Sequence, residues 1–290
     1  MAQPRLTTTD DSTTRRSFIA GLGSLGLAAV GTAPGRTSAV TDSHPREGLF
    51  TDPNELEAFI DDVMAERIGT TTPGATVAIV SGDAPVLTNG YGAADVDADV
   101  PARADETLFR VGSVGKLVTY TAVMQGVERG VLDLDTDVNS YLDDSRVTVP
   151  DTYDDPVTLR HLATHTAVFE STHHTDLVAA PAALDSLQTV LANQQPSRIR
   201  PPGALVGYSN YGAALTGHVV AEAHDTPFEE YVGSEIFDPL GMTHSTFAQP
   251  IPADQPGDLA APHIHDGESF EPADDVYLNM RPAGSLSATA

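Results

Sequence analysis

The residues of this sequence best suited to chemistry lie in the run Phe-Arg-Val-Gly-Ser-Val-Gly-Lys at positions 109–116. This run places Ser113 three residues before Lys116. Positions i and i+3 of a helix share one face, so the hydroxyl and the amine can meet. A serine hydroxyl becomes an effective nucleophile when a base takes its proton, and a buried lysine with a lowered pKa can act as that base. The start of a helix also favours negative charge that develops nearby.

Lys116 is the only lysine in the chain, which holds 14 arginines. Because 18 of the 290 residues are serine, a serine stands three places before any given lysine with a chance of about 6%. Arginine cannot give up its proton in a protein, so it cannot replace lysine in acid–base chemistry. We infer that this one lysine is retained for chemistry.

A second candidate element is the run Gly-Tyr-Ser-Asn-Tyr at 207–211, which follows a Pro-Pro-Gly break at 201–203. Tyr208 can serve as a general base or a proton relay when a nearby cation favours its anionic form. Asn210 offers both a donor and an acceptor to an amide-like substrate. Alone, a Tyr-x-Asn run more often marks a loop followed by a helix cap.

The composition restricts the partners of the chain. It carries 41 acidic and 15 basic residues, a formal net charge of −26, and the acids are scattered. Binding to nucleic acid or to an anionic membrane needs basic patches, so neither partner is expected. With no cysteine, the chain forms no disulfide, thiolate or cysteine–metal bond. A scattered excess of acids with a single lysine indicates a protein that stays soluble in high salt.

Residues 1–39 have the features of an export signal. Arg15 and Arg16 begin a twin-arginine pattern, and a weakly apolar run follows at 18–33. At 16 residues the run is short for a membrane span. We therefore expect a twin-arginine signal at 1–39, a secreted or extracytoplasmic domain at 40–290, and no stable membrane anchor in this chain.

Hydrophobic spacing predicts an α+β domain rather than an alternating βαβ order. A helix starts at Asp52 or the residue before it and runs to about Ile68, with Pro53 in its first turn. Strands at 74–80 and 86–91 form a hairpin. An apolar helix starts at about Ser113, and the segment 277–290 is expected to be short and irregular. Further helical patterns occupy 156–165, 183–193, 210–223 and 227–237.

Together these motifs resemble the class C β-lactamase-like serine hydrolases, a family that includes penicillin-recognising peptidases and esterases. The resemblance covers roughly residues 52–290 and keeps the motif order. It implies a β-lactamase/transpeptidase-like fold, with an antiparallel sheet flanked by helices and an all-helical region. Supporting stretches are Leu-Arg-His-Leu-Ala-Thr-His-Thr at 159–166, Pro-Gly at 202–203, Pro-Leu-Gly-Met at 239–242 and Pro-Ala-Gly-Ser-Leu-Ser at 282–287.

The resemblance also implies the roles of the site residues. Ser113 would be the acylated nucleophile, Lys116 its activator, Tyr208 the base in acylation and deacylation, and Asn210 a hydrogen-bonding partner of the substrate. We interpret His161 and His165, in the stretch 159–166, as structural. The implied partner is a small-molecule or peptide substrate, with no cofactor and no metal, and we expect a monomer.

One part of the family pattern lies outside this sequence. The family has a third motif, Lys-Thr-Gly or His-x-Gly, on a strand well after the segment that matches 282–287. The run His-Asp-Gly at 265–267 precedes that segment, and we interpret it as a turn. We therefore expect the C-terminal strands to be missing, and with them one of two oxyanion donors, the other being the N–H of Ser113. Losing one such donor costs about 10²–10³ in rate, so we expect at best weak activity.

Two kinds of acidic or histidine-rich run resemble metal sites without completing one. The runs at 95–99 and 133–139 alternate Asp as in a calcium loop, but each has Val where the loop needs Gly. His263, His265 and Asp266 suggest part of a metallohydrolase motif that is not completed. We interpret the acidic runs as solvated loops.

Two classes of function stay open. The first is a serine hydrolase that acts through an acyl-enzyme on amide or ester substrates: β-lactams, D-amino peptides or short esters. The second is a truncated non-catalytic relic or ligand-binding module of the same fold. Turnover that depends on Ser113 separates them.

Overall fold

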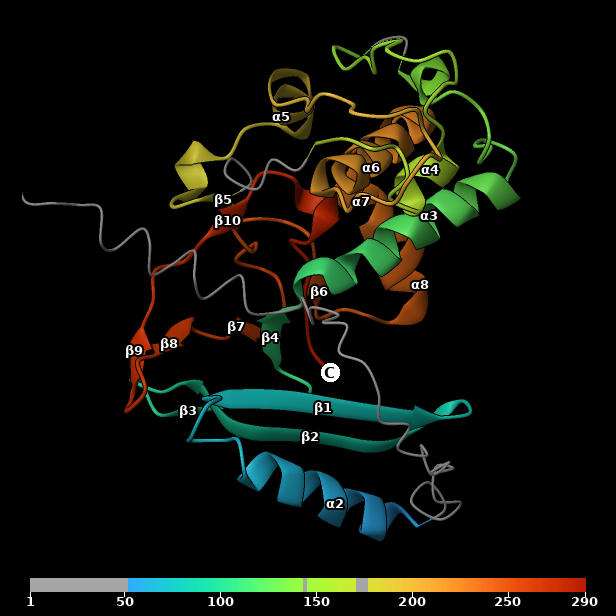
Figure 1. Cartoon of the computed structure of the whole chain (residues 1–290). Coiled ribbons are helices and arrows are strands. Elements are labelled where there is room, and N and C mark those ends of the chain that lie inside the picture. Colours follow the sequence, from blue (N-terminus) through green and yellow to red (C-terminus); the bar gives the residue numbers. More distant parts are fainter. Residues whose placement is uncertain (1–51, 143–144, 171–176) are drawn as a thin grey trace, which may run out of the picture. The chain divides into compact units, whose positions relative to one another are not determined.

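The computed structural model describes residues 52–142, 145–170 and 177–290, all within one compact unit at 48–290. The predicted twin-arginine signal at 1–39 lies outside the described residues. The described elements combine helices with mainly antiparallel strands, which confirms the predicted α+β class (Figure 1).

A helix and a hairpin open the described chain. Helix α2 (Pro53–Ala65) begins where Asp52 Oδ1 accepts the Asn54 N–H at 2.9 Å, and Pro53 supplies its first turn. Strands β1 (Gly74–Ser81) and β2 (Ala84–Asp95) pair antiparallel, and β3 (Val100–Pro101) pairs with β2. Figure 1 shows α2 along one face of the hairpin, with which it is in contact. In the described residues β1 forms an edge of this sheet.

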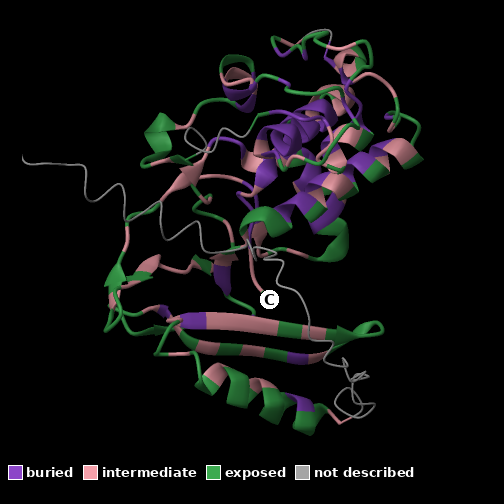
Figure 2. Cartoon of the chain, viewed as in Figure 1, coloured by how far each residue is buried: buried purple, intermediate pink, exposed green. Residues whose placement is uncertain are grey.

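The main hydrophobic core lies among the helices. Its central element is α6 (Asn210–His224), in which Leu215, Val219 and Val220 are fully buried. Helix α3 (Lys116–Glu128) and α4 (Leu159–Ala163) pack on α6, as do α5 (Leu187–Asn193) and α7 (Phe228–Val232). Figure 2 shows buried residues concentrated in these helices, whereas the hairpin is only partly buried. The predicted all-helical region is present, with α4 and α5 shorter than predicted, whereas the helix predicted at 227–237 is matched by continuous helical structure from residue 228 to 240.

A small sheet connects the hairpin to the helices. Its strand order is β6-β11-β4-β7, with β4 at Thr107–Arg110, β6 at Ser245–Thr246, β7 at Asp258–Leu259 and β11 at Ser287–Ala288. The segment 277–290 was predicted to be short and irregular, and the structure adds two short paired strands to it. This segment forms β10 (Tyr277–Leu278), the 3₁₀ turn η6 (Arg281–Ala283) and β11. Two-residue strands bear too few side chains for a period-2 pattern, so only pairing reveals them: β10 pairs with β5, and β11 pairs with β4 and β6.

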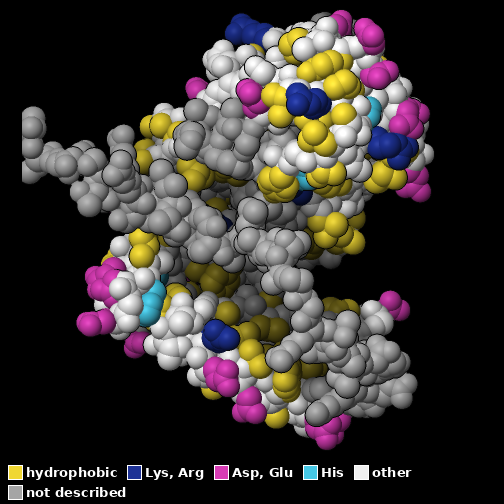
Figure 3. Space-filling view, in the orientation of Figure 1, with side chains coloured by type: hydrophobic (Ala, Val, Ile, Leu, Met, Phe, Trp, Pro, Cys, Tyr) yellow, Lys and Arg dark blue, Asp and Glu magenta, His cyan; other side chains and the backbone are white. Residues whose placement is uncertain are grey.

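Shorter elements complete the described chain: the 3₁₀ turns η1 (Gly112–Gly115), η2 (Val138–Tyr141) and η4 (Pro181–Ala183), strands β5 (Leu177–Val178), β8 (His263–His265) and β9 (Phe270–Pro272), the π-turn η5 (Gly233–Phe237) and helix α8 (Asp238–Leu240). Acidic side chains lie at several separate places on the face drawn in Figure 3. Among the helices of the described part, none has the length and apolar character needed to cross a membrane.

Candidate active site

Ser113 lies on a 3₁₀ turn rather than at the start of an α-helix. The chain leaves β4, turns at Gly112, and passes through η1 before α3 begins at Lys116. Gly112 has φ +56°, a left-handed conformation that favours glycine over residues with a Cβ. The predicted helix start at Ser113 was therefore three residues early. The spacing argument still holds, because three residues also make one turn of a 3₁₀-helix.

Lys116 is the central hydrogen-bond donor of the site. Its residue is only 6% exposed. Its Nζ donates to Ser113 Oγ at 3.0 Å, to Asn210 Oδ1 at 2.9 Å and to the backbone oxygen of Ala283 at 2.6 Å. These three acceptors match the three N–H donors of an ammonium group. A planar guanidinium could not reach the same three acceptors from one nitrogen, which accounts for a lysine in a chain otherwise built with arginine.

Tyr208 completes the contact with the serine. Its hydroxyl lies 2.8 Å from Ser113 Oγ, and Lys116 Nζ lies 4.9 Å from the centre of its ring. Either hydroxyl can be the donor in this hydrogen bond, while Lys116 donates to Ser113 Oγ. The structure thus brings together the four predicted site residues.

Helix α6 places Asn210 and supports the carbonyl of Ala283. Ser209 Oγ accepts the Gly212 N–H at 3.0 Å, so α6 starts at Asn210 beside Tyr208. Farther along α6, a Cβ on Gly217 would lie 2.4 Å from Pro282 side-chain atoms. Glycine at this position lets η6 approach α6 closely. The sequence identified the 282–287 stretch only by resemblance, whereas the structure shows why it matters: its backbone holds Lys116.

His165 contacts Tyr208, a relation that the sequence did not indicate. The two ring centres are 4.4 Å apart, and His165 Nδ1 accepts the Ser209 N–H at 3.3 Å. The backbone oxygen of His165 accepts the Gly207 N–H at 2.8 Å. Burial, and then the charge of Lys116, lowers the pKa of His165, which favours the neutral ring that can accept a hydrogen bond. His165 is therefore structural in the specific sense that it holds the 207–209 segment.

The other histidines of the sequence analysis lie in local structure. His161 forms a capping box with Thr158 at the start of α4. The run at 265–267 lies at the turn between β8 and β9, where Asp266 Oδ1 accepts the backbone N–H groups of Glu268 and Ser269 at 2.8 and 2.9 Å. This matches the predicted turn.

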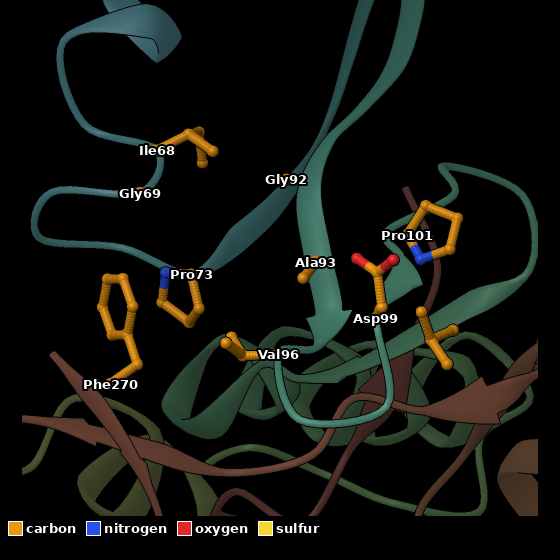
Figure 4. A pocket seen from close by; sticks show the side chains of 10 residues that line it. Ile68, Gly69, Pro73, Gly92, Ala93, Val96, Asp99, Pro101 and Phe270 are labelled. Carbon is orange, nitrogen blue, oxygen red and sulfur yellow. The ribbon is translucent and has the colours of Figure 1, made fainter.

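A separate pocket lies on the hairpin layer, between the end of α2, the β-strands and β9. Its mainly apolar lining includes Pro73, Val96 and Phe270, with the carboxylate of Asp99 beside Pro101 (Figure 4). None of the four predicted site residues lines it. The chemistry of the chain is therefore better judged from the Ser113 cluster than from this pocket.

The antiparallel strands, the helical region and the Ser113 cluster together define the β-lactamase/transpeptidase fold. A solved penicillin-binding protein homologue from Pyrococcus abyssi superposes with a TM-score of 0.61 at 26% identity, covering 82% of this chain and 54% of that one. The family model for Beta-lactamase matches residues 56–290, so the chain belongs to that family.

Two curated relatives show the breadth of the family. The chain is 31% identical over 178 residues to a Beta-lactamase of Yersinia enterocolitica, covering 61% of this chain and 43% of the relative. It is also 31% identical over 224 residues to Esterase EstB of Burkholderia gladioli, covering 73% of this chain and 55% of the esterase. The chain thus spans about half the length of the curated relatives that it matches. These similarities establish a hydrolase family, and they leave the substrate open.

Proposed function

We propose that this chain is a serine hydrolase that forms an acyl-enzyme on Ser113 with an ester or amide substrate. The observation that supports this most directly is the position of Ser113 Oγ, 3.0 Å from Lys116 Nζ and 2.8 Å from the Tyr208 hydroxyl. A nucleophile, a proton acceptor and a buried cation in mutual contact are the arrangement that acyl transfer by serine requires.

In the proposed first half-reaction, Ser113 Oγ attacks the substrate carbonyl carbon and its proton passes to the Tyr208 oxygen, which enters this step as the phenolate. The carbonyl π pair moves onto oxygen, giving a tetrahedral intermediate. The charge of Lys116 favours negative charge on the Ser113 and Tyr208 oxygens while the proton moves. The N–H of Ser113, at the start of a helical segment, is one donor for the oxyanion. Collapse of the tetrahedral intermediate breaks the bond to the leaving group, and the leaving group takes a proton from Tyr208.

The second half-reaction releases the acyl group. Water attacks the ester on Ser113, Tyr208 accepts a proton from the water, and the serine oxygen leaves and is protonated. The products are a carboxylic acid and free enzyme. Asn210, held by Lys116 at 2.9 Å, keeps the lysine aligned and offers its amide N–H to the substrate.

We further propose that neutral esters with apolar groups are the preferred substrates. Val114 is 65% exposed and Leu117 is 71% exposed, and both lie within one turn of Ser113. Val206, two residues before Tyr208, is 73% exposed. Such apolar side chains near a nucleophile favour an apolar acyl or alcohol group. The similarity to Esterase EstB also supports an ester substrate.

The test is hydrolysis of p-nitrophenyl butyrate, nitrocefin and a D-alanyl-D-alanine peptide by the purified chain in high salt. Ser113→Ala should abolish release above background. The matched control Ser234→Ala, at an exposed serine on η5, should behave as the parent chain. The ester should be turned over fastest. Equal rates for the parent chain and Ser113→Ala would exclude the proposed nucleophile, and acylation without turnover would favour the ligand-binding alternative.

We also propose that the chain is exported through the twin-arginine route and works in high salt. Arg15 and Arg16 ahead of a short apolar run support export. The acidic excess and the single lysine support salt adaptation.

A further inference from the structure

Two acidic residues and one histidine, far apart in the sequence, meet beside the turn that follows β2. Asp95 ends β2, Asp97 lies on the turn to β3, and His263 begins β8. The backbone N–H of Ala261 donates to the oxygen of Ala94 at 2.9 Å, which holds the segment before β8 on the end of β2. One ligand atom from each of the three side chains lies within 4.8 Å of the others.

The orientation of His263 points to a ligand. Its side chain is 1% exposed, and its Nδ1 lies 3.0 Å from the backbone oxygen of Ala261. Since a carbonyl only accepts, Nδ1 carries the proton, and Nε2 of a neutral ring presents a lone pair. Nε2 is buried and has no hydrogen-bond partner within the described structure. It faces Asp97 Oδ2 at 3.8 Å, too far for a hydrogen bond.

A buried nitrogen lone pair that faces a carboxylate without a hydrogen bond is unfavourable unless a cation lies between them. That cation is either a proton on Nε2 or a metal ion. The arrangement of His263 favours a metal ion, because histidines that bind metals commonly donate their other ring N–H to a backbone carbonyl. Asp95 is also fixed, since its Oδ1 accepts the Ala98 N–H at 3.0 Å.

We propose that Asp95, Asp97 and His263 form a binding site for a divalent transition metal ion, with Zn²⁺ the best match. One imidazole nitrogen with two carboxylate oxygens is a ligand set for Zn²⁺, whereas Ca²⁺ and Mg²⁺ prefer oxygen alone. Asp97 is 61% exposed, so water can reach the ion and fill its remaining position. Figure 4 shows Val96 and Asp99 of the same turn, with Asp99 lining the neighbouring pocket instead of this cluster.

The bound ion would link the β2–β3 turn to β8. Ions that bind only the folded state stabilise it, so the expected effect is on stability rather than on the Ser113 chemistry. The sequence concealed the site, because the Asp run at 95–99 and the His-rich run at 263–266 are each incomplete, and only the fold brings them together.

The test uses the untagged full chain, treated with a chelator and then titrated with ZnCl₂ by calorimetry and thermal unfolding. We expect one equivalent to bind and, at about 100 times the Kd, a Tm increase of about 5–10 °C. CaCl₂ at the same concentration should give no such increase. Co²⁺ should give the visible absorption bands of a site with nitrogen and oxygen ligands.

Asp97→Asn and His263→Gln should each remove the Tm increase. Asp99→Asn, on the same turn but outside the cluster, should retain it. Because Asp97 is largely exposed, Asp97→Asn keeps the test decisive even if His263→Gln does not fold. Absence of Zn²⁺ binding would overturn the proposal. Unchanged binding in Asp97→Asn would equally overturn it, because the ion would then be held elsewhere.

Discussion

Lys116→Arg separates the charge of Lys116 from its geometry. The substitution keeps a cation but replaces a nitrogen that donates to Ser113, Asn210 and Ala283 at 3.0, 2.9 and 2.6 Å with a planar group. The larger side chain must also fit where lysine is 6% exposed, and overpacking of this kind costs about 1–3 kcal/mol of stability. The variant should therefore fold, with a lowered Tm.

The rate should fall far more than the stability. Losing a preorganised donor at the reacting oxygen costs about 10²–10³ in rate, which corresponds to about 3–4 kcal/mol of barrier. We expect p-nitrophenol release by Lys116→Arg to fall by that factor at saturating ester. The control variant is Arg103→Lys. Arg103 is exposed and paired with Glu106, so this substitution should change the rate less than about twofold. A folded Lys116→Arg variant with a rate within about threefold of the parent chain would refute the reasoning.

Further predictions concern the proton acceptor, acid stability and export. Tyr208→Phe removes the oxygen 2.8 Å from Ser113 Oγ and should lower the acylation rate by about 10²–10⁴ with little change in Tm, whereas an unchanged stopped-flow burst would contradict its role. Burial lowers the pKa of His218 to about 4, so the unfolded chain binds a proton that the folded chain does not between pH 6.5 and 4. The free energy of unfolding should therefore fall as the pH drops through that window, and between pH 7.5 and 5 His218 should account for about 2 kcal/mol of the loss. Urea unfolding of His218→Gln should show a shallower pH dependence of stability than the parent chain. The same pH dependence in both would contradict the lowered pKa of His218. Replacing Arg15 and Arg16 by lysine should block export in a cell with a twin-arginine pathway, and undiminished secretion, judged by blotting of the medium, would refute the proposed signal.

The sequence was sufficient to predict the long elements and four residues that meet in the structure. Apolar residues predicted α2, the hairpin and α6, because long segments carry enough apolar side chains to reveal a helix or a strand. The only lysine, three residues after Ser113, predicted a contact that the structure shows at 3.0 Å. Tyr208 and Asn210 were identified by motif order, and both lie at the same site.

The features that could not be predicted from the sequence arise from contacts between segments far apart in the chain. The two-residue strand β11 is defined by its partners β4 and β6, and no local pattern marks it. The Ala283 oxygen that accepts from Lys116 is a backbone atom, so residue identity does not reveal it. The contact of His165 with Tyr208 depends on how the segments 161–167 and 201–209 fold together, which is set by backbone hydrogen bonds such as that from Gly203 to Thr166.

The most direct test of the central claim is to locate the acyl group. The chain should be mixed with p-nitrophenyl butyrate, quenched in acid within the first turnover, digested and mapped by mass spectrometry. The account predicts a butyryl adduct on the peptide that contains Ser113, absent from Ser113→Ala and reduced in Lys116→Arg and Tyr208→Phe. An adduct on a different serine among the 18, or p-nitrophenol release by Ser113→Ala at the parent rate, would contradict it.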